Sequence, residues 1–236
     1  MLPVFDRANL ETLRARVENH LRQAILGGQL KPGEKLIERE LCEMMGVSRP
    51  SLREALRKLE AEKLIINVPN RGPEVVSITL SEARDIYGLR RVLESYAAHE
   101  FARLASAEEI ATLGKAVKRL RTAGNKKSRD GVLKAKAEFY NTLLGGCGNS
   151  LVREVLDGLL SRVSLLRSTS LMLPDRLPKS LDEIDSLLEC IKRRDSQGAQ
   201  EISQQHVLSA ELAALSVFEQ QMALRKNQTT KKGKSS

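Results

Sequence analysis

The sequence predicts a mainly α-helical chain in two domains: a small amino-terminal domain that ends in a β-hairpin, and a larger all-α bundle. Three observations support this fold class. Apolar residues recur at helical spacing along most of the 236 residues. A single segment has the pattern of a β-hairpin, with two β-branched stretches on either side of a turn: "IINVPNRGPEVVSIT" (residues 65–79). Glycine- and proline-rich segments interrupt the helical pattern at intervals. A chain of this length can bury a core in each of two domains.

The composition is that of a globular protein, with 41% hydrophobic and 29% charged residues. Aromatic residues make up only 3%, which disfavours binding of single strands by base stacking. The sequence has neither an apolar run of about 20 residues nor a signal-peptide pattern, so we expect a cytoplasmic protein without a membrane partner. We expect Cys42, Cys147 and Cys190 to be reduced thiols, because they are few and widely separated.

The net charge of +9 does not by itself indicate nucleic-acid binding. Basic and acidic residues nearly balance within residues 1–79, and much of the excess lies between Lys115 and Arg129 and in the final "RKNQTTKKGKSS". The argument for a binding surface therefore depends on where individual cations lie.

The first domain should contain three short helices. We expect the first from about Leu10 to Leu26, ended by "GGQLKPGEKL", and the second from about Glu38 to Met45. Gly46 then supplies a tight turn, and Ser48 is a suitable N-cap for the third helix. Three helices followed by a hairpin form a winged helix-turn-helix, whose third helix enters the major groove of DNA.

The third helix should have two distinct faces. One face is apolar and consists of Leu52, Ala55, Leu56 and Leu59. The adjacent face carries Arg49, Arg53 and Arg57. These arginines are either the solvated side of an ordinary core helix or a surface that binds DNA; the turn, the cap and the hairpin favour the second interpretation.

From about Ser81 the pattern is helical nearly throughout, which predicts a bundle of about six helices that closes near Met222. "TAGNKKSRD", "GGCGNS", "LPDRLPKS" and "RRDSQG" separate the helices.

Residues from about Leu21 to Val76 closely resemble the GntR family of bacterial transcription regulators, through "LRQAILGGQLKPGEKLIERELCEMMGVSRPSLREALRKLEAEKLI" and "NRG". The helical remainder is similar to the FadR subgroup, whose effector domain is called FCD. This second similarity rests on "RRVLESYAAHEFA", "EFYNTLLGGCGNSLV" and "IKRRDSQGAQEISQQHVLSA".

The resemblance implies a homodimer that binds an operator in double-stranded DNA, a short inverted repeat, and responds to a small carboxylate metabolite. The family's DNA contacts fall here on Arg39, Ser48, Arg49, Ser51, Arg53, Arg71 and Gly72. Arginine can donate two parallel hydrogen bonds to guanine, worth about 1–3 kcal/mol of base discrimination. Arg57 should contact phosphate or solvent. Lys63 stands where the family usually has glycine, at a cost of about 1 kcal/mol if the backbone there is left-handed.

With this resemblance we expect four segments. They are a flexible amino terminus at residues 1–9, a DNA-binding domain at 10–79, an FCD-like effector-binding and dimerisation domain at 80–222, and a disordered basic tail at 223–236.

Many effector domains of this subgroup hold a divalent metal through an aspartate and three histidines. The corresponding positions here are Lys136, Tyr140, Ile184 and His206, so only His206 could bind a metal. We therefore expect no metal and no other cofactor. We expect instead that an anion binds directly, through Arg90, Lys136, Tyr140, Arg167 and His206. The alternative is that Lys136 points to water and His206 is a hydrogen-bonded core residue.

The leading functional prediction is a ligand-responsive transcription regulator, such as a repressor. The alternative is a metabolite-binding or scaffolding protein of the same fold that does not bind an operator. An enzyme is disfavoured, because the chain has no G-x-S-x-G, P-loop or dinucleotide-binding motif.

Overall fold

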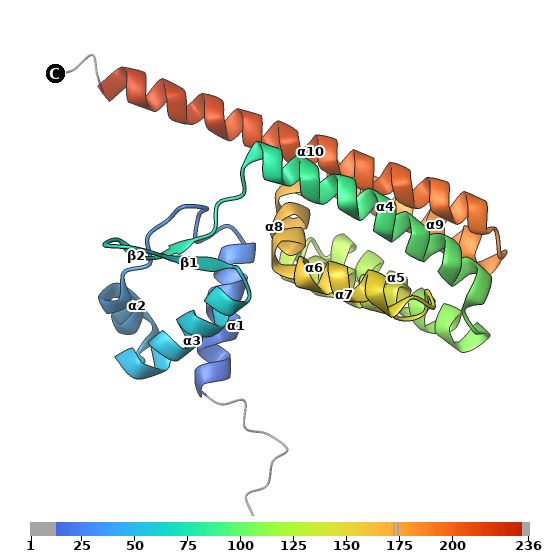
Figure 1. Ribbon diagram of the computed structural model, residues 1–236, viewed down its shortest axis with the longest axis horizontal. Coiled ribbons are helices and arrows are strands. Elements are labelled where there is room, and N and C mark those ends of the chain that lie inside the picture. The colour runs from blue at the N-terminus through green and yellow to red at the C-terminus, as the bar shows by residue number, and fades with distance from the viewer. Residues whose placement is uncertain (1–12, 172, 174, 233–236) are drawn as a thin grey trace, which may run out of the picture. The chain divides into compact units, whose positions relative to one another are not determined.

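The computed structural model describes residues 13–171, 173 and 175–232 and divides into two compact units (Figure 1). The first unit ends at Ser77 and the second begins at Ile78, whereas the sequence places the division after residue 79. The expected flexible segment 1–9 lies outside the described residues.

The first unit is a winged helix-turn-helix, as the sequence predicts. It consists of α1 (Leu13–Leu26), α2 (Glu38–Met45), α3 (Arg49–Ala61), β1 (Ile65–Val68) and β2 (Gly72–Val75). The two strands are antiparallel and pair from Ile65 with Val75 to Val68 with Gly72. The core lies between α1, α3 and the hairpin, and includes Leu21, Leu52, Leu59, Leu64 and Ile65.

Local signals fix both ends of α3. Gly46 adopts a left-handed conformation (φ 63°) that ends α2, and the side chain of Ser48 caps α3 by accepting a hydrogen bond from the amide of Ser51. Beyond the other end of α3, Lys63 is left-handed with φ 58°. The strained backbone that the sequence indicated for this lysine is therefore present.

The second unit is an all-α bundle. Its helices are α4 (Leu80–Leu104), α5 (Ala107–Asn125), α6 (Arg129–Gly145), α7 (Ser150–Gly158), α8 (Leu160–Ser170), α9 (Arg176–Lys192) and α10 (Ser196–Lys232). Helices α4 and α10 lie side by side along much of their length, and α5 packs against α6 and α9 (Figure 1). The apolar core between these helices includes Phe101, Leu113, Leu120, Phe139, Leu143 and Ile191.

The last helix is longer than the sequence analysis expects. Instead of closing near Met222 before a disordered tail, α10 continues to Lys232, and residues 233–236 lie outside the described part. The physical reason is composition: after Gly198 no glycine or proline interrupts the chain until Gly233. Within the described residues, no helix is both long and apolar enough to span a bilayer.

Candidate functional sites

Helix α3 presents its arginines to solvent. Leu52, Ala55, Leu56 and Leu59 are buried, as expected from their spacing. Arg49, Arg53 and Arg57 are exposed on the adjacent face. Among the residues that the structure describes, neither Arg49 nor Arg57 has an ion-pair partner. The helix is thus held by its apolar face while its guanidinium groups remain available to a ligand.

Arg53 is held along one edge by Glu38 of α2. Its Nε donates to both carboxylate oxygens of Glu38, at 3.1 and 2.9 Å, although the Arg53 side chain remains 59% exposed. No hydrogen bond is described for its two terminal Nη groups, so these can donate to an acceptor outside the unit. Glu38 was not among the residues predicted from the sequence, where its place directly before Arg39 is the only sign of this role.

The other residues predicted to contact DNA lie on three elements of the same unit. Arg39 is exposed on α2, and Ser48 and Ser51 lie at the start of α3 with their hydroxyl oxygens 3.0 Å apart. Arg71 lies at the hairpin turn, where it pairs with Glu74 at 3.0 Å and is 66% exposed. Gly72 has φ 86°, a conformation that favours glycine.

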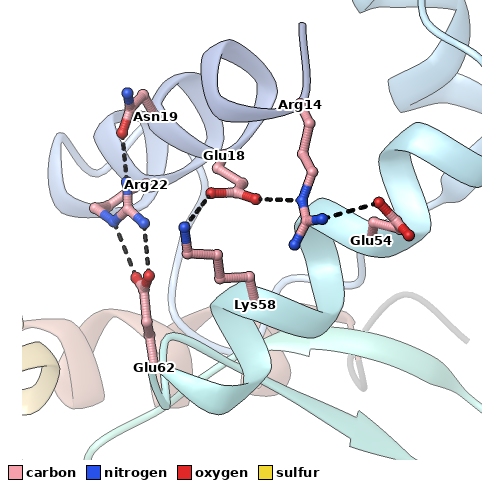
Figure 2. A network of polar contacts seen from close by, with 7 residues as sticks. All are labelled: Arg14, Glu18, Asn19, Arg22, Glu54, Lys58 and Glu62. Atoms are coloured by element: carbon pink, nitrogen blue, oxygen red, sulfur yellow. Dashed lines mark hydrogen bonds and ion pairs between the residues drawn. The ribbon is translucent and has the colours of Figure 1, made fainter. Parts of the chain in front are cut away.

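A network of ion pairs fixes α3 on α1 (Figure 2). Glu18 of α1 is buried, and it accepts from Arg14 at 2.9 Å and pairs with Lys58 of α3 at 2.8 Å. Burial raises the pKa of Glu18, but Lys58 and Arg14 outweigh this effect and lower it.

Two further pairs join α1 to α3 and to Glu62, the residue directly after α3. Arg14 reaches Glu54 at 3.1 Å, and Arg22 donates to both oxygens of Glu62 at 2.9 and 2.7 Å. Glu54 and Lys58 of α3 reach toward α1 in this network (Figure 2), whereas Arg49 is exposed and has no ion-pair partner among the described residues.

The second unit contains a buried polar cluster that brings together all five residues expected to bind an effector. Its members come from α4, α6, α8, α9 and α10, and their exposed fractions do not exceed 7%. They are Arg90, Glu94, Lys136, Tyr140, Arg167, Arg176, Ser180 and His206. The sequence analysis did not foresee Glu94, Arg176 or Ser180.

One half of the cluster is built around Glu94. Its carboxylate accepts from Arg90 Nε at 2.8 Å and from Arg167 Nη2 at 3.1 Å. The guanidinium of Arg167 lies 3.5 Å from the ring centroid of Tyr140. Burial raises the pKa of Glu94, but the charges of Arg90 and Arg167 bring it down to about 2. Glu94 is therefore ionised and fully occupied by two cations.

The other half contains the remaining cations. Lys136 Nζ donates to Ser180 Oγ at 2.7 Å, and Arg176 Nη2 donates to Glu183 at 2.9 Å. His206 Nδ1 lies 2.6 Å from the same Glu183 carboxylate, which can only accept, so the imidazole donates. Burial lowers the pKa of His206 to about 4 and keeps the ring neutral.

The sequence also allowed the alternative that Lys136 points to water and that His206 is a hydrogen-bonded core residue. The structure supports only the second of these. Lys136 does not point to water, because it is only 3% exposed. His206 is a hydrogen-bonded core histidine, as that alternative holds.

Among the residues that the structure describes, several buried guanidinium nitrogens of the cluster have no hydrogen-bond partner. These atoms are Nη1 of Arg90, Nε of Arg167, and Nε and Nη1 of Arg176. Glu94, Tyr140 and Arg167 also line a cavity of about 20 Å³, which holds one water molecule at most. Buried donors without acceptors are costly, so the cluster is suited to an anion that supplies the missing acceptors.

The residues of the cluster do not fit a divalent metal. Lys136 places an ammonium group where the resemblance implies a carboxylate ligand, and Ile184, which is 1% exposed, has no donor atom. In the described part of the chain, no group of three or more His, Cys, Asp or Glu residues is placed to hold a metal ion.

Both units match known families. The model of bacterial regulatory proteins of the gntR family matches residues 13–75, and the FCD domain model matches residues 85–209. The transcriptional repressor GlaR of Escherichia coli is 30% identical over 80% of this chain and 90% of its own length. The gluconate operon transcriptional repressor of Bacillus licheniformis is 26% identical over 76% of each chain.

Solved structures share the fold. A GntR regulator from Rhodococcus sp. RHA1 has a TM-score of 0.69 and 22% identity, and covers 86% of this chain and 97% of its own. E. coli McbR/YncC has a TM-score of 0.64 and 21% identity, and covers 93% of this chain and all of its own. The chain therefore belongs to the GntR family, in the FadR-like group with an FCD domain, and is a transcriptional regulator rather than an enzyme.

Proposed function

We propose that this regulator binds a short inverted-repeat operator as a homodimer and is controlled by a small carboxylate metabolite. The observation that carries the proposal is the exposed arginine face of α3, which leaves Arg49 and the terminal Nη groups of Arg53 available to contact base edges while the apolar face is buried. The N-terminal residues of such a helix lie nearest the bases.

The exposed arginines differ in their expected roles. Arg49 and Arg53 each have donors free for guanine O6 and N7, which supplies sequence discrimination. Arg57 lies two turns along α3 from Arg49 and is better placed for phosphate. Arg71 on the wing would contact the backbone or the minor groove.

An exposed apolar face supports the homodimer. Leu89, Val92 and Tyr96 follow one another along a single face of α4, and Val92 is 63% exposed. Leu151 and Val155 are exposed on α7, which packs against α4. Large exposed apolar groups at these spacings are typical of an oligomer interface. A dimer would place two recognition helices about 34 Å apart, one turn of duplex.

The buried cluster of the second unit supports the carboxylate effector. Four cationic side chains and several unsatisfied N–H donors converge there, and arginine and lysine are the usual partners of carboxylates. Relatives named for control of a gluconate operon agree with an organic acid as the signal.

The experiment is selection of bound duplexes from a random pool, repeated in the presence of a panel of organic acids. We expect an inverted repeat whose binding weakens steeply with salt and changes when one acid is added. Arg49→Ala should lose discrimination between sequences, whereas the matched control Arg57→Ala should weaken binding evenly. Failure to enrich any duplex, or a footprint without two-fold symmetry, would contradict the operator model.

A further inference from the structure

We infer that the effector carries two acidic groups about one helical turn apart and is bound without a metal. One acidic group would lie beside Arg90 and Arg167, and the other beside Lys136 and Arg176. This inference rests on the proposed function, in which the second unit binds a carboxylate, and it adds the charge and length of that ligand.

Basic side chains outnumber carboxylates in the buried cluster. The cluster has four basic side chains that are permanently or potentially cationic, Arg90, Lys136, Arg167 and Arg176. Against them stand two carboxylates, those of Glu94 and Glu183, and both are fully engaged: Glu94 with two arginines, Glu183 with Arg176 and His206. When Lys136 is protonated, two positive charges of the described cluster have no counter-charge, and a dianion would balance them.

Lys136 shows the cost of this imbalance most clearly. Burial, reinforced by the charges of Arg176 and Arg167, lowers the pKa of Lys136 well below its ordinary value. Its only described partner is the neutral hydroxyl of Ser180. An anion beside Nζ would remove the penalty on the ammonium form, because an opposite charge at close range favours the charged state.

The second argument is the position of the unsatisfied donors. Nη1 of Arg90 and Nε of Arg167 lack partners in one half of the cluster, and Nε and Nη1 of Arg176 lack them in the other. Lys136 and Tyr140, which belong to opposite halves, are four residues apart on α6, so their Cβ atoms are about 5–6 Å apart. Donors carried by neighbouring turns of one helix suit two acidic groups linked through about two or three carbon atoms.

The third argument is that the protein already supplies the positive charge a metal would bring. Lys136 stands at the position where the resemblance implies the aspartate ligand of a metal. Ile184 stands at the position of one of the histidine ligands and offers only hydrocarbon. The cavity of about 20 Å³ beside Glu94, Tyr140 and Arg167 holds no more than a water molecule, so an acid placed there must displace the surrounding side chains.

The test is calorimetric titration of the full-length, EDTA-treated protein with matched acids. Succinate, glutarate and malate are compared with butyrate, valerate and 2-hydroxybutyrate, which lack the second acidic group. We expect at least one diacid to bind at least about tenfold more tightly than its monoacid partner, since a charge-assisted hydrogen bond contributes about 1.5–3 kcal/mol. Binding should not change when EDTA is replaced by divalent metal ions.

Lys136→Met keeps the length of the side chain but removes its charge. It should abolish the preference for the diacid, whereas Lys134→Met, which changes an exposed lysine of the same helix, should keep the preference. Thermal unfolding of the Lys136→Met variant provides a second readout. It should destabilise the free protein little, because burial already disfavours the charged form of Lys136 and its described hydrogen bond goes to the neutral hydroxyl of Ser180.

Three results would overturn the inference. Equal affinity for matched monoacids and diacids, with no effect of Lys136→Met on the ratio, refutes the dianion while leaving a carboxylate effector intact. Dependence of binding on added metal refutes the metal-free site. If no acid of either kind binds, the carboxylate effector of the proposed function fails together with this inference.

Discussion

The two units use arginine in opposite environments. In the first unit, Arg49 and Arg53 are exposed on α3 and can exchange water for DNA. In the second, Arg90 and Arg167 are buried around a single carboxylate, and some of their nitrogens have no partner. The exposed set suits a large polyanion that approaches from outside, whereas the buried set suits a small anion that enters the protein. The residue type alone does not distinguish these roles.

The two units also differ in how exposed the partners of a buried carboxylate are. Glu18 and Glu94 each lie between two cations, but the partners of Glu18 are about half exposed whereas those of Glu94 are buried. Water screens the first set of ion pairs and is excluded from the second. We therefore expect the same substitution to cost far more in the bundle than in the winged helix.

The largest effect is expected for Glu94→Gln. Removing this charge leaves Arg90 and Arg167 without a counter-charge, which should lower the free energy of unfolding by about 3–5 kcal/mol. Urea denaturation measures it. The matched control Glu138→Gln breaks the exposed pair with Arg119 and should cost less than about 1 kcal/mol. Equal losses in the two variants would show that the cluster does not depend on Glu94.

The next effect is a dependence of stability on pH. The pKa of His206 is about 4 in the folded protein and near 6.5 when unfolded, so between these values the unfolded chain binds more protons. The free energy of unfolding should therefore fall as the pH drops from 6.5 to 4, by about 3 kcal/mol. Denaturation at several pH values measures the slope. His206→Gln should flatten it within this window, and an unchanged slope would contradict the assignment.

A smaller effect is expected at the DNA surface. Glu38→Gln should weaken the hydrogen bonds that orient the Arg53 guanidinium. We expect the ratio of affinity for the selected duplex to affinity for random DNA to fall by up to about tenfold. Affinity for random DNA should stay equal or rise, because a negative charge near the DNA is removed. Glu40→Gln removes the same charge from an exposed position of α2 and should leave the ratio unchanged. Fluorescence anisotropy with selected and scrambled duplexes measures both. A similar ratio in the two variants would mean that Glu38 does not position Arg53.

The smallest effect is expected at Lys63. Lys63→Gly should stabilise the protein by about 1 kcal/mol, because glycine adopts the left-handed backbone there without strain. Lys63→Ala removes the same charge and should give no such gain. Thermal unfolding compares the two variants, and equal midpoints would show that the backbone conformation is not the cause.

Much of the first unit could be predicted because its signals are local. The turn at Gly46, the cap at Ser48 and the apolar face of α3 each depend on residues within a few positions of one another. The ion pairs of Glu18 and Glu38 were missed, because their partners lie on other helices. The length of α10 also differs from the prediction, because the polar residues after Met222 predict disorder, yet no glycine or proline lies between Gly198 and Gly233 to end the helix.

By itself, the sequence determined the order of the helices, the hairpin and the exposed arginine face, since hydrophobic period and capping act over short distances. Only the tertiary structure decided that Glu94, Arg176 and Ser180 join Lys136 and His206 in one buried cluster. The physical reason is that helical period shows which face of a helix is apolar but not which helices meet. A charged residue within a helix is usually solvated, and its burial becomes evident only when its partners arrive from elsewhere in the chain.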